Sequence, residues 1–441
     1  MIYLVTKNRE LFTNEVYTII GVDESLSLLE PLKVVGLDTE TSGLDPYTCN
    51  LLSLQLGNYD TQIVIDCLTV DILKYKDYLE SDRLFIGWNL KFDLKWLYKY
   101  SIIPKRVYDG FLAEKLMWLG YPKGFHSMSL KTAGETYLGV ELDKSIRGKI
   151  IWNGLKSSDT IVYAAKDVQY LEKIMECQRE ELKKKDLLKA IEYENRFILP
   201  LAYCEFCGVK LDVEKWKAKV EKDKERELDA IKACDEWLIK NDPTNKYIFI
   251  DRQGDLFSGF NLEPQVTLNW NSAKQLAPLF KKYGVEIQIE DREKGGMKDS
   301  VDVKTLKPQE DKCSLIPLYL EYKKAVKVTS TYGRNFLDQI NPVSGRLHTN
   351  FQQLGADTTR ITSGGRDKAT GKEYVNLLNL PADAETRACF VAEEGNKFIS
   401  LDYVGQETYL MASIANDKAI IKELTEGSGD KQNVSHYSNI M

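Results

Sequence analysis

Short apolar runs of strand length are the feature that most limits how this chain can fold. In a sequence of 441 residues they lie at 33–37, 51–56, 62–66 and 84–88. Helical periodicity follows at 91–100, 109–119 and 128–138, and a long helical tract begins near Ser158 and continues beyond Asp186. Strands that come first, with helices after and around them, predict an α/β fold in which helices cover a sheet.

The rest of the chain changes character twice. A length of 441 residues exceeds one ordinary core, so about two to four domains are expected. From about residue 189 the sequence is rich in Lys, Glu, Leu and Ala, which predicts long helices. Beyond Gly345 the pattern is strand-like again, and we expect a strand from Lys397 to Asp402 that leads into a helix near 404–415.

Composition and charge limit the class of protein only loosely. A net charge of −6 does not indicate nucleic-acid binding, but it does not exclude it, because a local basic groove can lie on an acidic protein. The eight cysteines are scattered, as is typical of reduced thiols in a cytoplasm. The N-terminus lacks a charged leader before an apolar run, and no stretch of about 18 apolar residues occurs. We therefore expect a cytoplasmic protein with no signal peptide and no membrane span.

Two carboxylates lie together at the end of the first predicted strand. Asp38 and Glu40 are two residues apart, so on a strand both side chains point to the same face. Neighbouring carboxylates repel each other, and a divalent cation between them resolves the repulsion. The pair alone is weak evidence, because acidic turns are common.

Three further residues make the pattern specific. Asp93 lies where a predicted strand passes into a helix, and Tyr163 and Asp167 are one turn apart on a predicted helix, so they share a face. Together with Asp38 and Glu40 they supply oxygen ligands for two hard cations and a hydroxyl that can orient the attacking water. The set therefore predicts two-metal hydrolysis of a phosphodiester with two Mg²⁺ ions, which Mn²⁺ can replace.

These residues lie in segments that resemble a known family. Residues 37–41, 89–93 and 163–167 resemble the three exonuclease motifs of the DEDD family with tyrosine in the third motif, as in the proofreading domain of family A DNA polymerases. The resemblance implies an RNase H-like fold for residues 1–188. It also implies that Asp38, Glu40 and Asp167 hold one ion and that Asp38 binds the second with help from Asp93.

The same resemblance assigns three more roles in this domain. Tyr163 would position the hydrolytic water. Leu44, six residues after Asp38, matches the wedge that packs against the terminal base, and Asn89 falls among the DNA-binding positions.

Later segments extend the resemblance. Residues 269–276 and 328–332 resemble thumb segments of family A polymerases, and 345–351 with 358–363 resemble the strand pair that grips the minor groove of primer–template DNA. Arg360 matches a groove-contacting arginine, and Asn376 and Asn379 lie in the next DNA-binding motif. The resemblance implies a helical linker and mostly α thumb over 189–340, then a partial α+β palm over 341–441.

Residues 401–407 resemble motif A of the polymerase site. Asp402 would bind the catalytic metal ions, Tyr403 and His436 would contact the nucleotide, and Glu407 would exclude a ribose 2′-hydroxyl. No second metal-binding carboxylate motif and no fingers segment follows before Met441. We therefore expect either a fragment or a subunit completed by a second polypeptide that carries the fingers and the remaining palm.

Three functional hypotheses follow. The leading one is a family A polymerase subunit or fragment with 3′-5′ exonuclease activity on DNA, which binds a single-stranded 3′ end and a primer–template duplex. The second is a DEDD exoribonuclease similar to the RNase D group. The third is a noncatalytic DNA-binding subunit that completes a split polymerase.

Overall fold

The structure is a computed structural model that describes residues 1–9, 16–122, 124–142, 157–250, 264–291, 295–367, 371–403 and 405–426. Contacts divide the chain into two units, Met1–Phe390 and Val391–Met441. Each unit is described by itself. No described helix is both long and apolar enough to cross a membrane.

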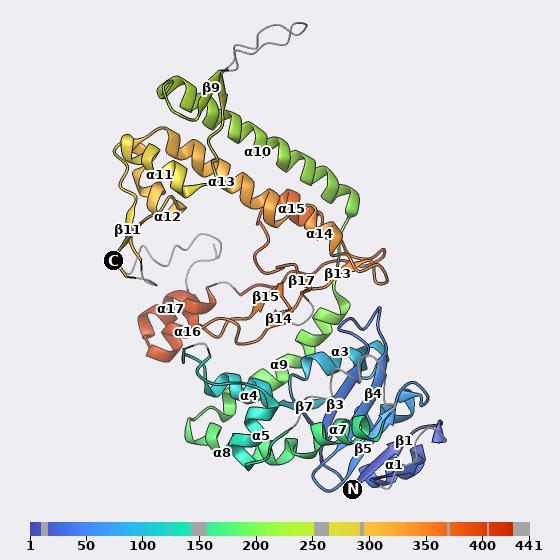
Figure 1. Ribbon diagram of the computed structural model, residues 1–441. Helices are drawn as coiled ribbons and strands as arrows, with labels where there is room; N and C mark the ends of the chain where they lie inside the picture. The colour runs from blue at the N-terminus through green and yellow to red at the C-terminus, as the bar shows by residue number, and fades with distance from the viewer. Residues whose placement is uncertain are drawn as a thin grey trace, which may run out of the picture. The chain divides into compact units, whose positions relative to one another are not determined.

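A mixed seven-stranded sheet forms the N-terminal part of the first unit (Figure 1). Its order is β2-β1-β5-β4-β3-β6-β7, with β3 antiparallel to β4 and parallel to β6. The strands are β1 Ile2–Val5, β2 Tyr17–Ile20, β3 Val34–Thr41, β4 Leu51–Gly57, β5 Gln62–Asp66, β6 Leu84–Gly87 and β7 Arg106–Asp109. The sheet confirms the predicted α/β fold, and β3 extends four residues beyond its predicted end at residue 37, so that Asp38 and Glu40 lie inside it.

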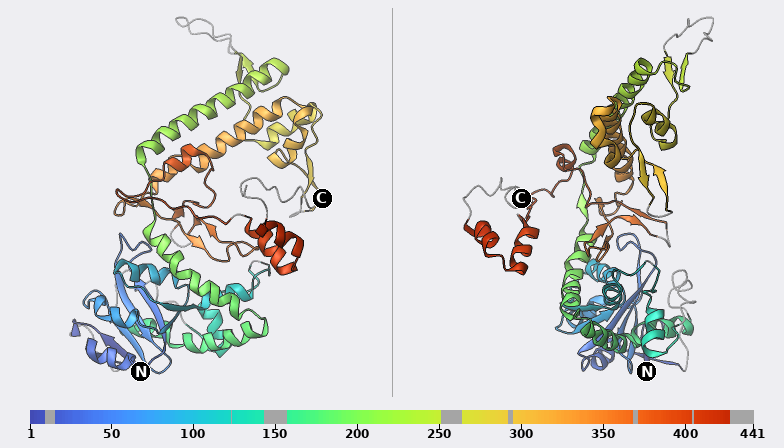
Figure 2. Two further views of the ribbon diagram at one scale, coloured as in Figure 1. Left: turned by 180° about the vertical axis from the view of Figure 1, so that it is seen from behind. Right: turned by 90° about the vertical axis from the view of Figure 1, so that its left-hand side faces the viewer.

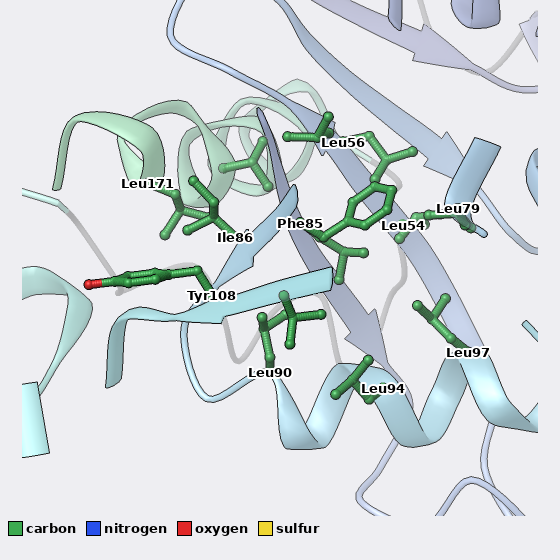
Figure 3. Packing of buried hydrophobic residues seen from close by; sticks show 14 of the residues in the cluster. Leu54, Leu56, Leu79, Phe85, Ile86, Leu90, Leu94, Leu97, Tyr108 and Leu171 are labelled. Carbon is green, nitrogen blue, oxygen red and sulfur yellow. The ribbon is translucent and has the colours of Figure 1, made fainter. Parts of the chain in front are cut away.

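The central strands are largely apolar because both faces of the sheet are covered. Every residue of β4 and β5 is buried. Figure 3 shows how Leu54 and Leu56 of β4 and Phe85 of β6 pack in the same cluster as Leu94 of α3 (Lys91–Lys99). This core holds the sheet rigid where the acidic residues lie.

Helices surround the sheet as expected, with one correction. They are α1 Val22–Leu29, α2 Lys76–Leu79, α4 Gly110–Met117, α5 Leu130–Leu138, α7 Ser158–Gln169, α8 Leu171–Lys184 and α9 Leu188–Cys207, with the 3₁₀ turn η2 Ile72–Tyr75. A capping box at Ser157 starts α7. The helical tract expected from near Ser158 past Asp186 is present, but it is divided: Tyr170 (φ −104°, ψ −3°) separates α7 from α8. This break lets α7 pack on β4 and β5 while α8 packs on β3 and β6.

A largely helical region follows α9. The long helices α10 (Val213–Asn241) and α13 (Leu315–Thr331) pack side by side in all views (Figures 1 and 2). A second core, with Trp237, Phe280 and Tyr319, joins them to α11. The other elements of this region are β8 Val209–Lys210, β9 Ile248–Ile250, β10 Pro264–Val266, α11 Ala273–Lys282, β11 Gln288–Glu290, β12 Met297–Asp299, α12 Val303–Leu306, η3 Lys307–Lys312 and α14 Asn335–Asp338.

Beyond Gly345 the predicted strands exist, but each is only two residues long. They are β13 Arg346–Leu347, β14 Phe351–Gln352, β15 Thr362–Ser363, β16 Gly365–Arg366 and β17 Glu373–Tyr374, and they precede α15 Ala384–Ala388. β14 pairs with β15 and β16 with β17, while β13 pairs with β8, at the start of α10. The expected strand pair around Arg360 is therefore present.

The second unit contains α16 (Gln406–Ala415) and α17 (Lys418–Glu426). The helix expected near 404–415 is confirmed. The strand expected from Lys397 to Asp402 is wrong, since that segment is irregular. A strand needs a neighbour to pair its N–H and C=O groups, and the described residues of this unit provide no such neighbour. Leu401 is 91% exposed.

Candidate functional site

Three carboxylates meet on one face of the sheet. Asp38 and Glu40 are two residues apart on β3, so their side chains point to the same face. Asp167 comes from α7, which packs on β3, β4 and β5. One carboxylate oxygen of each residue lies within 4.8 Å of the others. The structure thus brings together the three residues that the sequence assigned to one metal ion.

Gly36 lets α7 come this close to β3. A Cβ atom at residue 36 would lie 2.7 Å from the carbonyl oxygen of Val168, the residue after Asp167. That separation is too short for carbon and oxygen, so the helix backbone reaches the strand only because residue 36 has no side chain. The close approach sets Asp167 beside Asp38.

The chemistry of this cluster fits a divalent metal ion. Carboxylates at this separation repel one another, and Glu40 is buried, which makes its charge costly. A cation between them relieves the repulsion. All three candidate ligand atoms are oxygens, the donors that Mg²⁺ and Mn²⁺ prefer.

Asp93 lies outside this cluster. It is buried in the first turn of α3, and its Oδ1 accepts a hydrogen bond of 2.5 Å from the Thr39 hydroxyl. Because Thr39 alternates with Asp38 and Glu40 along β3, its side chain points to the other face of the sheet. Burial raises the pKa of Asp93 to about 7, while the Thr39 hydrogen bond opposes that rise. Its role in binding a second ion stays a prediction.

Tyr163 lies one turn before Asp167 on α7, as the spacing predicted. Its ring is buried against Leu52 of β4. The contact with the sheet fixes where the phenol can point. Its role in orienting a water molecule stays a prediction.

A cavity of about 240 Å³ lies between the N-terminal sheet domain and the β14 segment. Leu44 and Asn89, the two residues of this domain assigned to DNA binding, both line it. The wall also has cationic and aromatic side chains, among them Lys91, Phe92, Lys95, Lys115 and Phe351, beside the carboxylates of Asp109 and Asp367. The cavity therefore offers positive charge and apolar rings to one ligand.

A buried carboxylate holds Asn89 in place. Asn89 has a left-handed backbone (φ 64°), and Asp109 accepts hydrogen bonds of 2.9 Å from the N–H groups of Asn89 and Leu90. Asp109 also caps α4 through the Phe111 N–H. Burial raises the pKa of Asp109 to about 6, although these donors favour the carboxylate. Sequence reasoning missed Asp109; its place immediately before an apolar helix was the available signal.

Glu205 of α9 joins the cavity wall to the later strands. Its buried carboxylate accepts from Lys91 Nζ (2.5 Å), Lys95 Nζ (2.9 Å) and the Phe351 N–H (2.5 Å). Lys91 Nζ also donates to Asn350 Oδ1 (2.8 Å). Burial lowers the pKa of Lys91 to about 8. Sequence reasoning missed this hub, for which the sequence held no local signal.

The residues assigned to duplex DNA lie near β14 and β15 and beyond. Arg360 is exposed in the connection between these strands. Asn376 Oδ1 accepts from the N–H groups of Leu378 (3.0 Å) and Asn379 (3.1 Å) and so forms a turn, while the Asn379 carbonyl accepts from the Tyr332 hydroxyl. The Asn376 side chain therefore shapes the backbone here, and its contact with DNA stays a prediction.

The second unit carries the residues assigned to the polymerase site. Asp402, Tyr403 and Glu407 are exposed, and Glu407 lies in the first turn of α16. His436 lies outside the described residues. The acidic cluster found among the described residues does not include Asp402. The roles of all four stay predictions.

Comparisons with known proteins identify two family matches. A family profile described as 3'-5' exonuclease matches residues 14–183, which contain the acidic cluster. A profile described as DNA polymerase family A matches residues 260–431.

Curated relatives match both parts together. DNA polymerase I of Aquifex aeolicus is 27% identical over 425 residues, which cover 92% of this chain and 64% of the relative. DNA polymerase I of Borreliella burgdorferi is 29% identical over 426 residues, which cover 92% of this chain and 42% of the relative. The chain thus spans less than two thirds of these relatives' length.

A solved structure shares the fold. The POL domain of Pol1 from M. smegmatis, in complex with DNA primer-template and dNTP, matches with a TM-score of 0.67 and 19% identity, over 97% of this chain and 65% of that one. The fold and the cluster of Asp38, Glu40 and Asp167 define the N-terminal part as a 3′-5′ exonuclease domain with a site for a divalent metal ion. The chain as a whole belongs to the family A DNA polymerases.

Proposed function

We propose that this chain removes nucleotides from the 3′ end of DNA by metal-dependent hydrolysis. The observation that carries the proposal is the oxygen cluster of Asp38, Glu40 and Asp167, placed within the residues that match the 3′-5′ exonuclease profile. DNA is favoured over RNA as the substrate because the same chain matches DNA polymerase family A over residues 260–431.

The side chains divide the work at the exonuclease site. Divalent ions, when bound, would supply positive charge to the attacking and leaving oxygens of the phosphodiester. Asp38, Glu40 and Asp167 would hold one ion, and Asp38 would bind the second with help from Asp93, which accepts from the Thr39 hydroxyl in this structure. Tyr163 orients the water that attacks.

The cavity next to Asn89 receives the single-stranded 3′ end. Leu44 packs against the terminal base, and Asn89 contacts the strand. Lys95 and Lys115 of the same wall favour the phosphates. We further propose that Arg360, Asn376 and Asn379 contact a primer–template duplex, in line with the DNA complex of the M. smegmatis relative.

Polymerisation is a separate proposal. Asp402, Tyr403, Glu407 and His436 would contribute to a polymerase site together with fingers and palm segments, whether these belong to the same polypeptide or to a second one. Primer-extension assays of residues 1–441 with and without a polypeptide that carries those segments test this: we expect extension only when they are present, and extension by residues 1–441 alone contradicts it.

Nuclease assays on single-stranded DNA and RNA of one sequence test the main proposal. We expect DNA to be shortened from its 3′ end with Mg²⁺ or Mn²⁺ and not with EDTA. Asp38→Asn should lower the rate by about a thousandfold, since several kcal/mol of charge stabilisation are lost. Asp77→Asn, at an exposed carboxylate on α2, is the matched control and should keep the full rate.

Three outcomes separate the hypotheses. Faster cleavage of RNA than of DNA would favour the exoribonuclease. No release of nucleotides from either substrate would remove the nuclease proposal. In that case, binding of a partner polypeptide that survives Asp38→Ala would support a noncatalytic subunit.

A further inference from the structure

A second cavity lies on the exonuclease domain, and none of the residues assigned to the exonuclease, to DNA or to the polymerase site lines it. It measures about 650 Å³ and lies between the edge strand β7 and the helices α8 and α9; β7 and α9 are labelled in Figure 1. We call it the β7–α9 groove. Its size falls in the range of about 300–1,000 Å³ that is usual for small-ligand sites.

The rim of the groove is basic. Five of its lining residues are cationic and one is acidic: Lys105, Arg106, Arg179, Lys189, Arg196 and Glu192. Lys189 and Arg196 are seven residues apart on α9, so they share one face of that helix. Such a concentration of positive charge is unexpected in a chain with 66 acidic residues and a net charge of −6.

Within the described residues, most of these cations have no recorded acidic partner. Arg106 lies 3.8 Å from Asp82, and within the described part of the chain the structure records no ion pair for Lys105, Arg179, Lys189 or Arg196. The lysines of α10 differ: Lys215, Lys217 and Lys224 each pair with a carboxylate one turn away. Unpaired like charges around one cavity raise its positive potential, which an anionic ligand would neutralise.

The floor of the groove is apolar apart from the side-chain amide of Asn195. Val107 and Ile191 are buried there, and Leu84, Leu188 and Leu199 are partly buried. Asn195 is 7% exposed, and its Oδ1 accepts from the Asp109 N–H (2.9 Å), which leaves its NH₂ group to donate toward a ligand. An apolar surface with an amide donor inside a ring of cations matches a flat heteroaromatic base joined to a phosphate.

We propose that the β7–α9 groove binds a nucleotide unit, with its phosphate among the cations and its base on the apolar floor. The unit can belong to a free nucleotide or to a single strand, and the two sources share this chemistry. Tyr193 and Phe197, one turn apart on α9, are 56% and 42% exposed beside Arg196 in sequence. Exposed rings next to cations suit stacking of the adjacent bases of a strand.

Binding and cross-linking of the full chain in EDTA test this site independently of catalysis. The probes are fluorescein-labelled (dT)₁₂, followed by anisotropy, and the photolabel 8-azido-dATP, followed by peptide mapping. We expect cross-links in residues 105–108 and 188–199. The double variant Arg179→Gln/Arg196→Gln should bind about tenfold more weakly, and the salt slope for (dT)₁₂ should fall by about 0.7 for each lost phosphate contact.

The matched control is Lys215→Gln/Lys217→Gln, which removes two exposed charges from α10 and should leave binding unchanged. All substituted side chains are exposed, so unchanged thermal unfolding verifies the fold. A weaker signal with both probes supports the site for free nucleotides. If the arginine variant loses binding of (dT)₁₂ but not of the photolabel, and Tyr193→Ala/Phe197→Ala reproduces that loss, the result supports a single strand as the source.

Unchanged binding of both probes by the arginine variant, with cross-links confined to other segments, overturns the proposal. A failure of exonuclease activity in separate assays does not affect this outcome, because no hydrolysis takes place in EDTA.

Discussion

The N-terminal sheet and the strands after residue 345 are built in opposite ways. In the sheet, all residues of β4 and β5 are buried, and two residues of the acidic cluster, Asp38 and Glu40, lie on β3, which pairs with strands on both sides. The later strands are two residues long, and the second unit exposes Ile399 and Leu401 almost fully. The exonuclease residues therefore owe their positions to a core of their own, whereas Asp402, Tyr403 and Glu407, assigned to the polymerase site, are exposed within their unit.

The largest effect is expected where the two regions join. Glu205→Ala leaves the ammonium groups of Lys91 and Lys95 without their shared carboxylate. Breaking a buried ion pair on one side costs about 3–5 kcal/mol. Chemical denaturation should show that loss, while Glu192→Ala, on the exposed face of the same helix, should stay within about 0.5 kcal/mol. Equal free energies of unfolding for the Glu205→Ala and Glu192→Ala variants would mean that the Glu205 contacts do not hold the two regions together.

The same truncation in each region tests the contrast directly. Leu54→Ala in β4 should lower the free energy of unfolding by about 2–5 kcal/mol, because it opens a cavity in a fully buried core. Leu401→Ala should change it by less than about 0.5 kcal/mol, because that side chain is 91% exposed. A large effect at Leu401 would show that the second unit buries this residue.

A single methyl group should disturb the acidic cluster. Gly36→Ala places a Cβ against the Val168 carbonyl and forces α7 away from β3, at a cost of about 1–3 kcal/mol. Thermal unfolding and the Mg²⁺ dependence of nuclease activity should both worsen. Gly21→Ala, where a Cβ meets nothing within 4 Å, should keep the wild-type requirement for Mg²⁺.

The smallest expected effect is a change of the free energy of unfolding with pH. Burial raises the pKa of Asp109 to about 6 in the folded chain, above its value when unfolded. Between pH about 4 and 6 the folded state then binds more protons, so stability falls as pH rises and levels off above about 6. In Asp109→Asn this fall should be reduced, as measured by urea denaturation at each pH. The pH slopes of stability are compared, rather than the stabilities themselves, because the substitution also removes the carboxylate oxygen that accepts from the Leu90 N–H.

Local sequence patterns predicted the central strands of the sheet better than its edge strands. The apolar runs at 51–56 and 62–66 became β4 and β5 almost to the residue, since strands covered on both faces leave an unbroken apolar signal. The four-residue strands β1, β2 and β7 were not foreseen, although β6 of the same length was, because so short a segment carries little periodicity. The strand expected at 397–402 failed for another reason: Phe398, Ile399 and Leu401 are apolar, but pairing depends on neighbours that local sequence does not specify.

The candidate site divides in a similar way. Strand and helix periods predicted that Asp38 shares a face with Glu40 and Tyr163 with Asp167, whereas the meeting of Asp167 with the β3 pair was implied by the resemblance to the exonuclease motifs. The contacts of Glu205 could not, since Lys91 and Phe351 are 114 and 146 residues away along the chain. The same holds for Asp93, whose spacing gave its position on α3 but not its hydrogen bond to Thr39.

The N-terminal end of α10 follows directly on a short pair of strands. With 29 residues the helix is about 43 Å long, and its N-terminal end is tied to β13 through the two-residue strand β8. Gly208, just before that strand, has no room for a side chain against the Leu347 carbonyl. A tilt of about 10° at this end would move the far end of the helix by about 7.5 Å, so a small change in the packing around Trp216 at its start would be enlarged along the α10–α13 pair.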